Sequence, residues 1–181
     1  MTAIAQTPVR VRPAARKRSV LQPVFAAIAL LILIPICIAL PVTLLHGRPL
    51  PWQFHLPWVA PHVGVALAVL ALGVMQLTLR KGDKRHRTIG YAWCALMAFI
   101  SVSGLLIQLK PGPPTIIHIA SSAFSAINLI LLPLVIWGAH TGRRRLHRIA
   151  ALGMFASLLN AGLMTFVPFR AIGLLVFGAL H

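Results

Sequence analysis

The sequence predicts an all-α integral membrane protein of about five transmembrane helices. Hydrophobic residues make up 59% of its 181 residues, and only 10% are charged, whereas soluble proteins carry roughly 25% charged residues. The lysines and arginines gather in short clusters between long apolar runs, which is how membrane proteins carry basic residues. A soluble fold needs a polar exterior, so lipid is the solvent that fits this composition.

Five apolar segments are long enough to span a bilayer, whose hydrocarbon core of about 30 Å needs roughly 20 helical residues. We expect helices, because lipid offers no partners to an open strand and the alternating pattern of a membrane barrel is absent. Prolines at 35, 41 and 133 predict kinks in the first and fourth segments. The five segments are 24–45, 59–79, 89–109, 116–139 and 149–168.

These segments divide the chain into four parts. We expect a basic cytoplasmic tail at 1–23, an anchor helix at 24–46, a four-helix membrane bundle at 59–168 and an interfacial tail at 169–181. The basic start followed by an apolar run also resembles a signal peptide, but the run is too long and no small-residue cleavage site follows it. The last tail is too short to span, so it lies at the interface or packs against the bundle.

The orientation follows from the basic residues. Of the 17 lysines and arginines, 14 fall before the first span, between the second and third, or between the fourth and fifth. Arg48, Lys110 and Arg170 fall on the other side. Because basic loops stay in the cytoplasm, we expect a multi-pass protein of the bacterial inner membrane with a cytoplasmic N-terminus. Trp52 and Trp58 fit an outer interfacial belt.

The bundle contains an internal repeat. Each copy reads as a histidine, an apolar helix, a basic turn, a His-Arg pair and a helix rich in small residues. Repeat 1 covers 59–109 and repeat 2 covers 116–168. Each copy is a two-helix hairpin, and two hairpins make a four-helix bundle.

Four histidines open the four bundle helices. His62 and His118 lie at the outer end, and His86 and His147 at the inner end. Alternate helices of such a bundle face each other on a diagonal, so we expect a His62/His118 pair and a His86/His147 pair. Two neutral imidazoles facing each other are an axial ligand set for haem iron. The candidate cofactor is therefore haem b, with all four histidines as its iron ligands.

The helix faces that carry these histidines are small or mildly polar, which predicts that they point inward. About 27 Å of helix separates His62 from Arg80, so two haems would lie near opposite membrane faces. The predicted inward residues are His62, Ala66, Val69, Gly73 and Gln76; His86, Gly90, Trp93, Met97 and Gly104; His118, Ser121, Ser122, Ser125 and Asn128; and His147, Ala150, Ala151, Met154, Ala161 and Thr165.

A plainer interpretation uses the same residues. Small and serine-rich faces also let membrane helices pack closely without a cofactor, and a histidine beside an arginine suits the headgroup zone. The other histidines, His46, His55, His140 and His181, are interpreted as solvent or interface residues.

The segments "RHRTIGYAW" and "RRLHRIAALGM" resemble a bacterial membrane family, domain-of-unknown-function family 2306. The resemblance covers about residues 60–175 and includes His62, "LRKGDKRHRTIG" and "TFVPFR"; it implies architecture but no chemistry. A looser likeness is to cytochrome b561, whose members hold two haems with four histidines paired between alternate helices. That likeness implies the same roles for His62 with His118 and for His86 with His147.

Other chemistry is restricted by composition. Asp83 is the only acidic residue, which excludes carboxylate acid-base catalysis and carboxylate metal sites. The clustering of charge between spans argues against nucleic acid as a partner. Cys37 and Cys94 fall inside apolar runs and are predicted to be buried. The inner basic clusters set topology or bind an anion or lipid headgroup; their candidate residues are Arg80, Lys81, Arg85, Arg143, Arg144 and Arg145.

Two functional hypotheses follow. The first is a di-haem protein, a membrane oxidoreductase or electron carrier, that passes electrons between the membrane faces with a redox partner. The second is a cofactor-free membrane protein for transport, assembly or lipid interaction, surrounded by membrane lipid and joined to a partner subunit.

Overall fold

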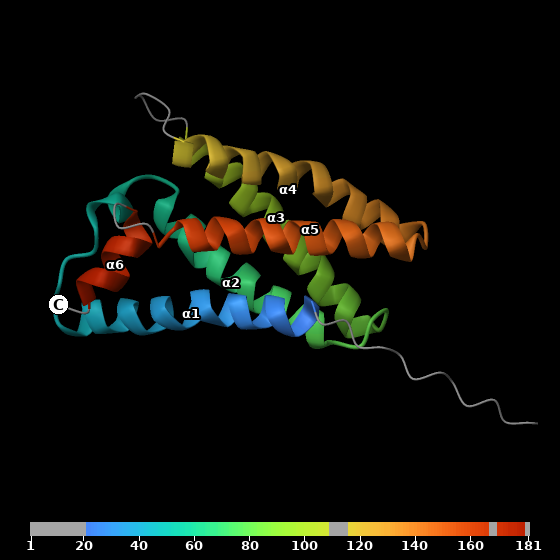
Figure 1. The fold of residues 1–181 in the computed structure, drawn as a ribbon, viewed down its shortest axis with the longest axis horizontal. Coiled ribbons are helices and arrows are strands. Elements are labelled where there is room, and N and C mark those ends of the chain that lie inside the picture. Colours follow the sequence, from blue (N-terminus) through green and yellow to red (C-terminus); the bar gives the residue numbers. More distant parts are fainter. Residues whose placement is uncertain (1–20, 109–115, 167–169, 180–181) are drawn as a thin grey trace, which may run out of the picture.

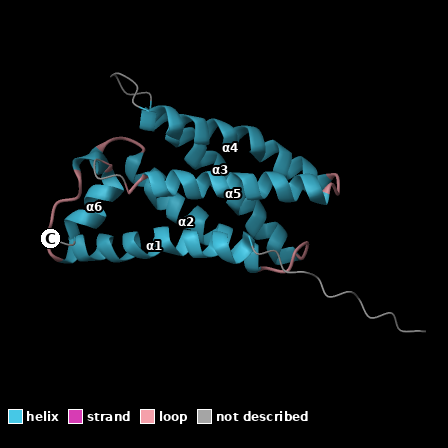
Figure 2. Cartoon of the chain, viewed as in Figure 1, coloured by secondary structure: helices cyan, strands magenta, loops and turns pink. Residues whose placement is uncertain are grey.

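The computed structural model describes residues 21–108, 116–166 and 170–179, and these contain helices but no strand (Figure 2). Five helices are long and apolar enough to cross a membrane, which confirms the predicted all-α class. The helices are α1 (Leu21–Leu45), the short 3₁₀ helix η1 (Trp52–His55), α2 (Val59–Thr78), α3 (Lys84–Gln108), α4 (Ile116–His140), α5 (Arg144–Met164) and α6 (Ala171–Ala179). Most of the predicted basic tail, together with Lys110 and His181, lies outside the described residues.

Figure 1 shows α1, α5 and α4 in one layer, with α2 and α3 crossing behind them. Consecutive helices from α2 to α5 pack in pairs, and α1 closes the ring by packing against both α2 and α5. Among the described residues, α2 makes no close backbone approach to α4, nor α3 to α5. These two pairs therefore occupy diagonal positions, and the predicted anchor helix is part of the bundle.

The two hairpin turns are alike and lie at the same end of the molecule as the start of α1 (Figure 1). Gly82 and Gly142 each adopt a left-handed backbone, with φ of +85° and +68°, a conformation that glycine adopts without steric cost. We call this end, with turns 79–83 and 141–143, the basic end, and the other end the η1 end. Both α3 and α5 begin about five residues before the predicted apolar segments, because the basic residues beside each turn are already helical.

The middle parts of the predicted inward faces lie in the core, whereas His118 is exposed. Val69, Met97 and Met154 are fully enclosed, and Trp93 donates its indole N–H to the carbonyl of Val69 at 3.1 Å. Even in the best-covered span, α3, only 39% of the apolar window is buried. Lipid must therefore cover most of the apolar surface.

Helix α1 joins the core through a stripe that recurs every three or four residues. Ile32 of this stripe reaches α5, where a Cβ at Gly162 would lie 3.0 Å from its Cδ1. The helix runs as one element through Pro35 and Pro41, as α4 does through Pro133. The stripe contains Ala29, Ile32, Ile36, Ala39 and Thr43.

The two cysteines differ in their surroundings. Cys94 is buried as predicted, but Cys37 is exposed. Cys37 follows Ile36, which is on the buried stripe, and one residue turns a helix by about 100°. The prediction for Cys37 was wrong because an apolar run does not indicate which side of its helix faces the core.

Candidate functional site

The basic end positions His86 on the first turn of α3. The side chain of Asp83 accepts the backbone N–H of His86 at 2.7 Å, which makes Asp83 the N-cap of the helix. The amide nitrogen of Gln76 in α2 donates to the backbone carbonyl of His86 at 2.9 Å. His86 is therefore held from both sides by the hairpin to which it belongs.

His147 occupies the equivalent place in the second hairpin. Its Nδ1 lies 3.0 Å from the carbonyl oxygen of Val135 in α4. Because a carbonyl can only accept, Nδ1 carries the proton and Nε2 is the acceptor of this ring. Helices α4 and α5 are in close contact here, since a Cβ at Gly138 would lie 2.7 Å from the backbone nitrogen of His147.

The structure brings these two histidines together across the α3–α5 diagonal. Their ring centroids are 6.4 Å apart and their planes meet at 82°. Nδ1 of His86 is buried without a hydrogen-bond partner, as is Oε1 of Gln76. Unpartnered buried polar atoms are rare in native proteins and often mark a missing water, ion or ligand.

The η1 end positions His62 differently from the prediction. Nδ1 of His62 lies 2.9 Å from Oγ of Ser103 in α3. That hydroxyl donates to the carbonyl of Phe99 at 2.7 Å, so it accepts the Nδ1 proton of His62. A Cβ at Gly104 would lie 3.4 Å from Cε1 of His62 and 2.8 Å from Oγ of Ser125. The α4 residue level with His62 is therefore Ser125.

His118 does not lie at the level of His62. It precedes Ser125 by seven residues, or about 10.5 Å along the helix, and its side chain is exposed. The hairpin alignment equates the two histidines in sequence, but α4 is displaced by about two turns relative to α2. Where a His62/His118 pair was predicted, the structure has His62 with Ser103, opposite Ser125.

Arg170 also lies near the η1 end. The pattern of histidines in the sequence did not identify it as a candidate functional residue. Its Nη1 donates to Oγ of Ser121 at 3.1 Å, and Ser121 lies one turn from Ser125 on the same face of α4. The amide oxygen of Asn128, one turn deeper, is buried without a partner. The serine-rich face of segment 116–139 could have indicated such a residue, because an inward polar face needs a polar neighbour.

The six basic candidates at the basic end have exposed side chains. Lys81 donates to the carbonyls of Gln76 and Leu77 at the end of α2, so it also caps that helix. Arg143 lies over the ring of Trp137, 4.3 Å from its centroid, in cation–π contact. The other four are Arg80, Arg85, Arg144 and Arg145.

The donor set limits which metal groups fit. No group of three or more histidine, cysteine or acidic side chains suited to a metal occurs in the described ranges, whereas structural zinc needs four protein ligands. Two imidazoles are the complete protein ligand set for a haem iron. His86 and His147 fit that requirement, and His62 with His118 does not.

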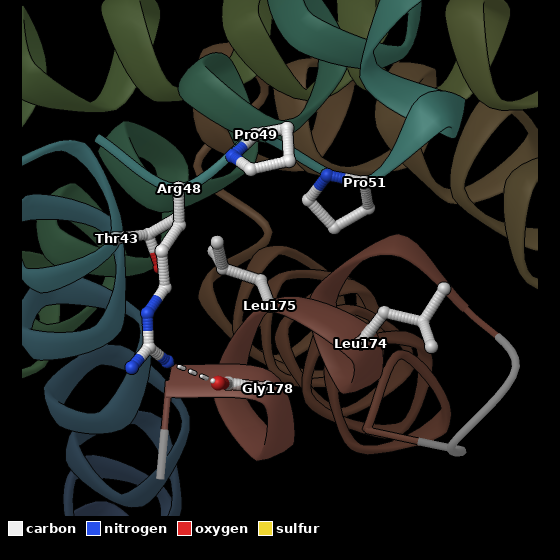
Figure 3. Close-up of a pocket in the computed structure, with 7 residues that line it drawn as sticks. All are labelled: Thr43, Arg48, Pro49, Pro51, Leu174, Leu175 and Gly178. Atoms are coloured by element: carbon white, nitrogen blue, oxygen red, sulfur yellow. Dashed lines mark hydrogen bonds between the residues drawn. The ribbon is translucent and has the colours of Figure 1, made fainter. Parts of the chain in front are cut away.

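The cavities lie elsewhere. A cavity of about 270 Å³ opens between α1, α6 and the loop before η1, where Arg48 donates to the carbonyl of Gly178 at 2.8 Å (Figure 3). A smaller one of about 90 Å³ lies between α1 and α5. None of the four candidate histidines lines either cavity.

His46, His55 and His140 are exposed, in agreement with their interpretation as solvent or interface residues. Nδ1 of His46 lies 2.8 Å from the carbonyl of Val42, and His140 contacts the hydroxyl of Tyr91 at 3.2 Å.

No protein-family model, curated protein or solved structure matches this chain.

Proposed function

We propose that this protein is a redox protein of the bacterial inner membrane that binds one b-type haem between His86 and His147. The observation that carries the proposal is the 6.4 Å separation of the two ring centroids across the bundle. An imidazole nitrogen lies about 2.0–2.1 Å from a bound metal such as zinc. Two such nitrogens on opposite sides of one metal place their ring centroids roughly 6 Å apart.

The hydrogen bonds of the pair support the same assignment. A metal-binding histidine usually donates its other ring N–H to a carbonyl or a carboxylate, which orients the ring. His147 has this arrangement, since Nδ1 donates to Val135 and Nε2 keeps its lone pair. His86 has a buried Nδ1 without a partner. Each ring thus has a nitrogen available to bind a metal.

The charges of the basic end also suit the cofactor. Haem b carries two carboxylates, and Arg85 and Arg144 lie within three residues of the two histidines. Both arginines are exposed, so they are accessible to carboxylates, lipid phosphates or an acidic redox partner. The positive-inside rule orients this end toward the cytoplasm. When bound, haem supplies reversible one-electron transfer at this membrane face.

The proposal has one haem where the sequence predicted two. At the η1 end, His62 supplies one imidazole, which Ser103 orients. Ser125 lies where the second histidine was expected. The looser likeness to cytochrome b561 remains part of the proposal only for the His86/His147 pair.

The second candidate is a cofactor-free membrane protein for transport, assembly or lipid interaction. The close contact of Gly138 with the backbone of His147 favours it, because helices packed this tightly leave little space beside the ring. In this alternative, His86 and His147 serve only to hold the helices together at the basic end through their packing and hydrogen bonds.

A reduced-minus-oxidised absorption spectrum of the protein purified from haem-replete cells distinguishes the two candidates. We expect haem b bands at one haem per chain, lost in His86→Ala and in His147→Ala. His140→Ala is the matched control, because His140 lies at the same end but bonds to Tyr91, and it should keep the bands. A colourless wild-type protein would exclude the redox function, and two haems per chain would restore the arrangement predicted from sequence.

A further inference from the structure

A half-buried arginine near the η1 end has no acidic partner. Arg170 donates one N–H to Ser121, and a guanidinium has five such donors. Ser121 is the hydrogen-bond partner that the described part of the chain gives to Arg170. Burial lowers the pKa of Arg170, but a guanidinium remains charged at physiological pH. A positive charge here is therefore partly removed from water without a counter-charge.

The protein itself cannot neutralise this charge from a side chain. Asp83 is the only acidic residue of the chain, and it caps α3 at the basic end. About 30 Å of helix separates Asp83 from Ser103, which is several times the Debye length at physiological salt. The two charges are too far apart to interact usefully.

The surroundings of Arg170 are polar and neutral. Ser121 and Ser125 lie one turn apart on one face of α4. His62 contributes an imidazole whose Nδ1 hydrogen-bonds to Ser103. None of these groups brings a negative charge. Removing a charge from water without a partner is costly, so this face is suited to a ligand that brings the missing charge.

We propose that Arg170, oriented by its hydrogen bond to Ser121, forms an anion-binding site for a phosphate group at the η1 end. A guanidinium presents two parallel N–H donors that match the oxygens of phosphate. The phosphate group belongs either to a free anion or to the headgroup of an anionic lipid, since Arg170 follows the end of the candidate span Arg144–Met164 by six residues. This inference uses none of the residues of the proposed haem site.

The test is thermal unfolding in nanodiscs, followed by tryptophan fluorescence. In neutral phosphatidylcholine, inorganic phosphate should raise the Tm by roughly 3–6 °C at ten times its Kd, compared with chloride at the same ionic strength. In a second arm, phosphatidylglycerol replaces part of the neutral lipid and no phosphate is added. A shift in the first arm identifies a free anion, and a shift in the second arm alone identifies a lipid headgroup.

Three variants assign the shift to the site. Arg170→Gln should abolish it, and Ser121→Ala should raise the phosphate midpoint about fivefold, because it removes the hydrogen bond that orients the guanidinium. Arg48→Gln is the matched control, because Arg48 is also an arginine near the η1 end but is exposed and bonded to Gly178. If Arg170→Gln does not fold, Ser121→Ala alone decides. The proposal is overturned if neither arm raises the wild-type Tm, or if the shift survives these two substitutions unchanged.

Discussion

Phe155 of α5 packs on the bare Cα of Gly73 in α2, where a Cβ would lie 2.2 Å from Cε2 of the ring. The same ring pairs with Phe25 of α1 at a centroid distance of 6.0 Å. One aromatic side chain therefore joins the second hairpin to the first and joins both to α1. The contact explains how α1 becomes part of the bundle.

Replacing Gly73 by alanine should destabilise the protein. The added methyl group forces Phe155 to move in a core that includes Phe25, and overpacking of this kind costs about 1–3 kcal/mol. The measurement is the Tm in detergent. Gly64→Ala on the same helix is the control, because nothing lies within 4 Å of its Cβ position, and its Tm should not fall. Equal Tm values for the two variants would refute the contact.

The cap of α3 should be sensitive to its side chain. Asp83→Ala removes the acceptor for the N–H of His86, and losing such a cap costs about 0.5–2 kcal/mol. Asp83→Asn keeps an oxygen at the same place and should retain most of the stability. Comparing the unfolding of both variants separates the hydrogen bond from the charge. An alanine variant as stable as the wild type would show that the cap contributes nothing.

A methyl group added at Gly138, where α4 and α5 meet at the basic end, should destabilise the protein. A Cβ at residue 138 would lie 2.7 Å from the backbone nitrogen of His147, and backbone cannot rotate away. We expect Gly138→Ala to lower the Tm more than Gly153→Ala, where the nearest atom is Cδ1 of Leu131 at 3.2 Å. The end of a leucine side chain can move at small cost. The reverse order of Tm values would contradict the packing.

The orientation in the membrane can be tested by cysteine labelling. In a background without Cys37 and Cys94, we expect His55→Cys in spheroplasts to react with a membrane-impermeant maleimide. Thr141→Cys, at the basic end, should react only after the membrane is opened, because basic loops stay in the cytoplasm. Both side chains are exposed, so burial does not explain a difference. Labelling in the opposite order would invert the topology and move the proposed haem site to the outer face.

Much of the fold followed from local properties of the chain. Each span was predictable because an apolar segment of about 20 residues can lie in hydrocarbon only as a helix. The inward faces were predictable from helical spacing, and Val69, Met97 and Met154 are enclosed as expected. The apolar segments begin about five residues after the starts of α3 and α5, because hydropathy detects the apolar part of a helix and not its capped, basic first turns.

The sequence by itself determined the number of spans, most of the buried positions on the four bundle helices and the histidine at the start of each of them. Only the tertiary structure decided which of these histidines meet. His86 and His147 come together, while His118 lies about two turns from the level of His62 and Arg170 lies beside Ser121. The axial shift of one helix against another is set by contacts such as Gly138 with His147 and Gly73 with Phe155. Such contacts join residues far apart in the chain, so helical periodicity within one segment contains no information about them.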